Sequence, residues 1–181
     1  MREYGLDRPD IRFDLRLQDV TEVVRGSDFR LFAKAELVKA LRVPGGDVLT
    51  RREIDDLTEF VKIYGAQGLA WIKIKEDEWQ SPIAKFLSSK EQQGLKESLG
   101  LEPGDIVFFQ AGQPEMVNAA LGNVRLRLGK RFELIPHNTY APVWITDFPL
   151  MEWSPDDKRW VAFHHPFTSP REEDVHLLSS A

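Results

Sequence analysis

An adjacent pair of histidines, His164 and His165, is the arrangement in this sequence that most directly suggests chemistry. Neighbouring side chains on a strand point to opposite faces, so one imidazole could face a cleft while the other packs or bonds to the backbone. Pro166 would help to fix the path of the chain. The alternative is a surface pair with no chemical role. A metal site is not expected, because two adjacent histidines seldom chelate one ion and the spacing indicates no third ligand.

A second candidate is a basic cluster of four residues within seven positions, Arg125, Arg127, Lys130 and Arg131. The whole chain has 24 basic and 29 acidic residues and a net charge of -5, so a polyanion would have to bind to a local cluster of this kind. The alternative is a solvated helix end, where cations complement the negative end of the helix dipole.

Other residue patterns are weaker. Asp147 and Glu152 could be site carboxylates, but carboxylates near strand ends are also common as simple hydrogen-bonding residues. The glycine-containing stretches at 44–46 and 65–68 lack the spacing of phosphate-binding loops and indicate turns. No catalytic residue follows from residue types alone.

Composition narrows the class of protein. The chain has 181 residues and no cysteine, which excludes disulfides, thiolate metal sites and a cysteine nucleophile. No stretch approaches the roughly 18 apolar residues of a membrane span, and the first residues contain no apolar core of a secretory signal. We therefore expect a cytoplasmic protein without a membrane partner.

The elements that would position these residues alternate between strand and helix. Period-two and period-3.6 patterns, together with turn residues, predict an α+β fold with helices packed on a mixed or antiparallel sheet. The expected strands cover residues 11–17, 29–33, 37–43, 70–75, 106–110, 140–153 and 159–163. The expected helices follow Asp19, Thr50, Pro82, Ser89, Pro114 and Pro170.

Two helix starts carry the sequence signature of a capping box. Asp19 with Glu22, and Thr50 with Glu53, place a capping side chain three residues before a glutamate that can reach back to it. For the helix that starts at Pro114, Gly129 is the expected end.

The middle of the chain differs from its ends. Residues 27–139 hold a self-consistent set of strands and helices, whereas 1–26 and 140–181 supply strands with little helix to cover them. This pattern is expected when one domain is inserted into a loop of another. We therefore predict that residues 27–139 fold without their flanks.

Six segments in succession resemble bacterial-type aspartyl-tRNA synthetase. The likeness covers essentially the whole chain, in the order of that family, although Leu6 stands where the family more often has serine. The segments are YGLDRPDIRF at 4–13, VKALRVPGG at 38–46, GAQGLAWIK at 65–73, SPIAKFL at 81–87, WITDFPL at 144–150 and HHPFT at 164–168.

This resemblance implies a function and a domain organisation. Residues 27–139 would be the GAD insertion domain, and 1–26 and 140–181 would be segments of a class II catalytic domain. The family uses ATP and magnesium to form aspartyl-adenylate, and then transfers aspartate to its tRNA. Carried over by position, His164 would contact bound L-aspartate and His165 would support that site.

The resemblance also indicates what this chain lacks. The arginines that clamp ATP stand in family motifs that are absent here, so we expect the chain alone to be inactive, to bind no cofactor and to be monomeric. The complete enzyme would be a homodimer. The alternative is a non-catalytic module of the GAD type that binds tRNA or another protein; the histidine pair favours the synthetase.

Overall fold

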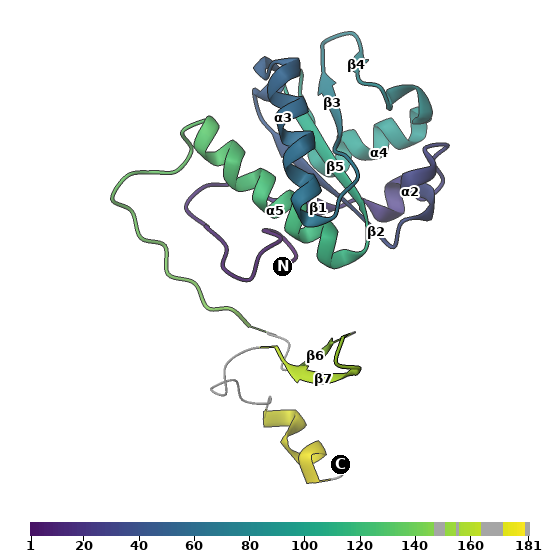
Figure 1. Cartoon of the computed structure of the whole chain (residues 1–181). Helices are drawn as coiled ribbons and strands as arrows, with labels where there is room; N and C mark the ends of the chain where they lie inside the picture. Colours follow the sequence, from purple (N-terminus) through teal and green to yellow (C-terminus); the bar gives the residue numbers. More distant parts are fainter. Residues whose placement is uncertain (147–150, 155, 164–171, 180–181) are drawn as a thin grey trace. The chain divides into compact units, whose positions relative to one another are not determined.

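The computed structural model describes residues 1–146, 151–154, 156–163 and 172–179 of the chain (Figure 1). These residues form two compact units, Met1–Ala141 and Pro142–Ala181. Each unit is described by itself below.

A five-stranded antiparallel sheet is the centre of the first unit (Figure 1). Its strand order is β1-β2-β5-β3-β4, and every neighbouring pair is antiparallel. The strands are β1 (Leu17–Asp19), β2 (Leu37–Val43), β3 (Ala70–Ile74), β4 (Trp79–Gln80) and β5 (Ile106–Gly112). The predicted α+β class with helices on a sheet is confirmed.

Helices cover both faces of this sheet. Helices α3 and α5 contribute buried side chains to one apolar core, and α1, α2 and α4 contribute to the other. The α-helices are α1 (Thr21–Val24), α2 (Arg30–Lys34), α3 (Arg51–Val61), α4 (Ser89–Leu99) and α5 (Pro114–Arg131). Short 3-10 turns are η1 (Gly46–Val48), η2 (Lys62–Tyr64) and η3 (Ala84–Phe86).

The central strand β5 supplies side chains to both cores. Ile106 and Phe108 pack with α3 and α5, and Val107 and Phe109 pack with the opposite group of helices. Each of the four is at most 1% exposed. Because successive side chains on a strand point to opposite faces, a strand covered on both sides must be apolar at every position.

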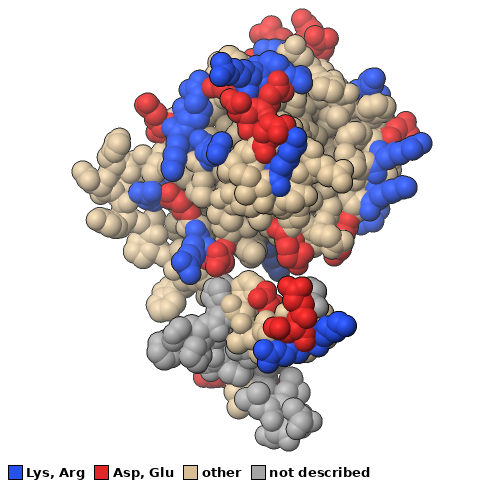
Figure 2. All heavy atoms as spheres, viewed as in Figure 1, with Lys and Arg blue, Asp and Glu red and all other residues tan. Residues whose placement is uncertain are grey.

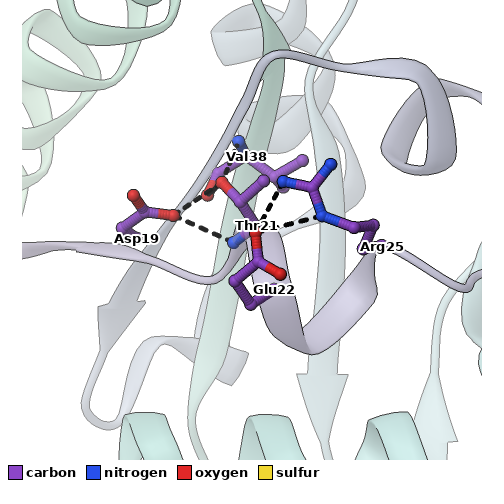
Figure 3. Close-up of polar contacts among 5 residues, drawn as sticks. All are labelled: Asp19, Thr21, Glu22, Arg25 and Val38. Atoms are coloured by element: carbon purple, nitrogen blue, oxygen red, sulfur yellow. Dashed lines mark hydrogen bonds and ion pairs between the residues drawn. The ribbon is translucent and has the colours of Figure 1, made fainter.

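The start of α3 is as predicted. Thr50 Oγ1 accepts a hydrogen bond from Glu53 N, and the Glu53 carboxylate accepts one from Thr50 N at 2.8 Å. The prediction for Asp19 and Glu22 is wrong, as Figure 3 shows. Asp19 accepts bonds from the backbone N–H and hydroxyl of Thr21, while Glu22 pairs with Arg25.

Two further expectations about elements are corrected. Residues 29–33 were expected to form a strand, but Arg30–Lys34 is helix α2. The ring of Phe29, the N-cap residue of α2, meets the ring of Phe32 edge to face, with centroids 4.9 Å apart. Helix α5 runs past Gly129, which lies against the ring of Phe13, so a side chain there would clash.

The N-terminal segment packs onto the sheet and α5. The predicted alternation is correct for Phe13, Leu15 and Leu17, which are all buried in one core, although ladder pairing begins only at Leu17. Arg125 of α5, 1% exposed, donates from Nη2 to Phe13 O at 2.7 Å and from Nε to Leu15 O. Its guanidinium also lies over the Phe13 ring, 3.9 Å from the centroid.

A second buried cation fixes the same segment. Lys39 of β2, 5% exposed, donates from Nζ to Arg2 O and to Asn118 Oδ1, both at 2.7 Å. Burial lowers the pKa of this amine. The acceptors of both cations are neutral oxygens, so neither side chain forms a direct ion pair with another described residue, and each is held by hydrogen bonds.

The second unit contains an antiparallel hairpin of β6 (Met151–Ser154) and β7 (Arg159–Ala162), and a 3-10 segment, η4 (Glu172–Ser179). The predicted return strand is confirmed over these residues. Trp153 and Trp160 stand opposite each other, with their rings edge to face and centroids 5.8 Å apart.

Replacing Arg125 with methionine is expected to lower the free energy of unfolding by about 3 kcal/mol or more, because the carbonyls of Phe13 and Leu15 lose their charged donor. Urea denaturation of the whole chain, followed by far-UV circular dichroism, measures this. Lys130→Met, at an exposed position of the same helix, is the control. Equal losses in the two variants would contradict a specific role for the buried guanidinium.

The predicted domain limits, 1–26, 27–139 and 140–181, stay a prediction, but the contacts of the N-terminal segment change what we expect of residues 27–139 alone. Phe13, Leu15, Leu17, Val20 and Val24 are buried. At about 1.5–3 kcal/mol for each buried side chain, their loss matches a typical domain stability of about 5–15 kcal/mol.

We therefore expect the polypeptide 1–141 to fold and the polypeptide 27–139 to lack a cooperative unfolding transition. Thermal unfolding and amide dispersion in NMR spectra, recorded for both, decide this. A sharp transition for 27–139 at the same temperature as for 1–141 would show that residues 1–26 do not contribute to the stability of the fold.

Candidate functional site

The histidine pair predicted as a substrate site, His164 and His165, lies outside the described residues, as does Asp147. Strand β7 ends at Ala162, two residues before the pair. Glu152 is exposed on β6, opposite Val161. The placement of these predicted site residues relative to one another therefore stays a prediction.

The hairpin that leads to the pair has a defined turn. Asp157 N donates to Ser154 Oγ at 3.2 Å, and Lys158 has a left-handed backbone with φ 51°. Together with the Trp153–Trp160 contact across the strands, the turn fixes the register of β7.

The basic cluster predicted at the end of α5 is not a uniform surface patch. Arg125 is buried and serves the N-terminal segment, so its inclusion in a solvent-facing cluster was wrong. Arg127 lies over the ring of Phe60, 3.5 Å from its centroid. Arg131 donates to Glu53 Oε1 at 2.7 Å.

Acidic side chains offset the positive charge of the three remaining cations, Arg127, Lys130 and Arg131. The hydrogen bond from Arg131, followed by bonds from the backbone and hydroxyl of Thr50, lowers the pKa of Glu53 to about 2. A hollow of about 410 Å³ here is lined by Glu53 and Asp56 as well as by the cations. On the face shown in Figure 2, acidic and basic side chains lie largely beside each other. The helix-end interpretation fits this arrangement better than a polyanion site.

A larger pocket, which the sequence did not indicate, lies at the β3–β5 end of the sheet. Its volume is about 610 Å³, and its walls come from residues 29–32 at α2, the 65–71 segment, Pro82 and Ile83, β5 and the start of α5. Trp71, Phe109 and Met116 are among its apolar lining residues. No motif of neighbouring residues in the sequence indicates this pocket, because its lining residues lie in separate segments of the chain and each apolar one is typical of a core.

The described residues contain no group of three or more His, Cys, Asp or Glu side chains that could hold a metal ion. Among the same residues, no helix is both long and apolar enough to cross a bilayer.

The sequence matches the model of the GAD domain over residues 31–121, about half of the chain. This range lies within the limits 27–139 expected from the sequence. The match covers all of β2 and β3 and most of the central sheet with its helices.

Curated relatives extend the match to nearly the whole chain. The chain is 69% identical to an aspartate–tRNA(Asp/Asn) ligase of Oleidesulfovibrio alaskensis over 98% of the chain and 29% of that protein. It is 67% identical to the ligase of the same name from Nitratidesulfovibrio vulgaris over 99% of the chain and 30% of that protein. For an aspartate–tRNA ligase of Halalkalibacterium halodurans the identity is 46%, over 99% of the chain and 31% of that protein.

The chain thus spans about 30% of the length of the curated relatives that it matches. These names confirm the resemblance predicted from the six segments. Together with the antiparallel sheet and its two helical layers, the match over residues 31–121 shows that the chain belongs to the GAD domain family.

Proposed function

We propose that the protein to which this chain belongs is an aspartate–tRNA ligase, which joins L-aspartate to tRNA through an aspartyl-adenylate. The observation that carries this proposal is an identity of 67–69% with such ligases over 98–99% of the chain. Its partners would be aspartate and an aspartate-specific tRNA, and it would act as a cytoplasmic homodimer.

Within that protein, residues 27–139 would form the GAD insertion domain, and 1–26 and 140–181 would belong to the catalytic domain. The hairpin β6–β7 supports this division, because it belongs to a different compact unit from the sheet, and His164 follows its second strand in the sequence. The contacts of residues 1–26 with α5 would then join the insertion firmly to the catalytic domain on its N-terminal side.

We assign His164 to the site that binds aspartate, with His165 as its support. An imidazole can donate a hydrogen bond to a carboxylate and, when protonated, also attracts its charge. The fixed register of β7 and the restricted backbone of Pro166 would limit the ordering required when the substrate binds.

ATP and magnesium would supply the activation of the carboxylate and would be bound by other parts of the complete enzyme. The described residues of this chain offer no cluster of three or more metal-ligating side chains. On this proposal the chain contributes a substrate contact, and the charge stabilisation needed to transfer the adenylyl group of ATP to aspartate, with release of pyrophosphate, must come from elsewhere.

In the complete enzyme, His164→Ala is expected to raise KM for aspartate about 10- to 150-fold, with little change in KM for ATP, because one hydrogen bond to a charged carboxylate is lost. Aspartate-dependent pyrophosphate exchange, with each substrate varied in turn, measures both constants. His137→Ala is the matched control, since His137 is exposed in the first unit. Equal changes for both substrates would remove His164 from the aspartate site.

The chain of 181 residues by itself is expected to catalyse no aspartate-dependent pyrophosphate exchange above the background of a mock preparation. Each factor of ten in rate needs about 1.4 kcal/mol of transition-state stabilisation, and the family's ATP-clamping arginines are not in this sequence. Exchange that depends on aspartate and exceeds the background would refute this proposal of inactivity and leave the family assignment unchanged.

A further inference from the structure

The pocket beside Trp71 lies where β3 stops and β5 continues. The last ladder pair between these strands is Ala70 with Phe109, whereas β5 extends to Gly112. On its other side β5 stays paired with β2 up to Gly112. Residues 110–112 of β5 therefore have a strand neighbour on one side only.

The backbone groups of Ala111 face the side without a strand. Ala111 stands opposite Val38 of β2, but Val38 N donates to Thr21 Oγ1 and Val38 O accepts from Val20 N, both at 2.9 Å (Figure 3 shows Val38 and Thr21). Both groups of Val38 thus point away from β5, which makes Val38–Ala111 a non-hydrogen-bonded pair of the ladder. The N–H and C=O of Ala111 must point toward the continuation of β3.

Nothing in the described part of the chain takes up these two groups. No ladder pair of β3 reaches Ala111. The loop residue nearest in register is Gly68, and its carbonyl oxygen accepts a hydrogen bond from Gln110 Nε2 at 2.6 Å. A partly buried backbone donor and acceptor on an open strand edge favour pairing with an added extended chain.

The pocket at this edge is uncharged. All fifteen described residues that line it are apolar or neutral, in a chain of which 29% of the residues are charged. Its aromatic lining residues are Phe29, Phe32, Trp71 and Phe109. A phosphate or carboxylate would lose its hydration here without gaining a counter-charge from any lining residue, so nucleotides and aspartate are unsuitable ligands. An apolar side chain is the matching occupant.

We propose that this site binds an extended, uncharged segment of a partner polypeptide, which forms backbone hydrogen bonds with Ala111 and inserts an apolar side chain into the pocket. The paired donor and acceptor of one residue, next to an apolar hollow of about 610 Å³, fit a peptide, because main-chain bonds provide affinity and a side-chain pocket provides selectivity. The proposal goes beyond aminoacylation and does not depend on it.

Leu31 and Met116 border the site and extend its apolar surface. Leu31 is 63% exposed on α2, so its side chain contributes little to the core and is free to contact an occupant. Met116 stands in the first turn of α5, and its unbranched side chain can adjust to different shapes. Leu31 is therefore the position where the site can be changed with least effect on folding.

The test uses the whole 181-residue chain and capped single residues as probes. N-acetyl-phenylalanine N-methylamide and N-acetyl-leucine N-methylamide each carry two amide N–H donors, two carbonyl acceptors and an apolar side chain; the aspartate analogue is the charged control. We expect the two apolar probes to cause saturable NMR shifts of the Ala111 and Gln110 amides and the Trp71 indole, with a Kd in the millimolar range of about 1–10 mM for so small a ligand.

Leu31→Glu is expected to weaken this binding at least about tenfold, because it places a charge at the apolar rim. Val48→Glu is the matched control: Val48 is also largely exposed, at 64%, and does not line the pocket. Binding unchanged by Leu31→Glu, equal shifts with the aspartate probe, or no shifts at tens of millimolar would each overturn the proposal. No outcome depends on ATP, tRNA or aminoacylation activity, so failure here leaves the ligase proposal intact.

Discussion

The burial of β5 on both faces and between two strands is the constraint on which the first unit depends. A strand in this position can carry no exposed side chain along its covered length, and the run Ile106–Phe109 meets that requirement. Each face then needs its own helical layer, since an apolar sheet face in water would be unstable. The positions of α3 and α5 on one side and of α1, α2 and α4 on the other follow from it.

Elements whose signals are local could be predicted from the sequence. The Thr50–Glu53 capping box and the apolar run of β5 depend only on residues close together in the chain, and both were located correctly. Residues 29–33 were misassigned because five apolar-rich residues fit either period. In the helical conformation of this segment Phe29 contacts Phe32 and also Phe86, which lies more than fifty positions away in the sequence.

The candidate sites were less predictable, for the same physical reason. Arg125 looked like one member of a charged helix end, yet its acceptors are the carbonyls of Phe13 and Leu15, more than a hundred residues earlier. The pocket at the end of β3 combines five separate segments, none of which is unusual in itself. The histidine pair stands out in the sequence because its two residues are adjacent, and its proposed role, which stays a prediction, rests on family likeness.

Because Arg125 donates to main-chain carbonyls of the N-terminal segment, the segment can vary in sequence more freely than Arg125 itself. Main-chain carbonyls are present whatever the side chain, so the guanidinium holds the course of the N-terminal segment without specifying residue types at positions 13 and 15. Those positions are limited by volume and apolarity in the core, and a substitution such as methionine for Leu15 meets both limits. At the other end of the contact a lysine could not replace the arginine, because only a planar guanidinium presents two N–H groups in fixed directions. We therefore expect related sequences to tolerate several apolar residue types at positions 13 and 15 and only arginine at position 125.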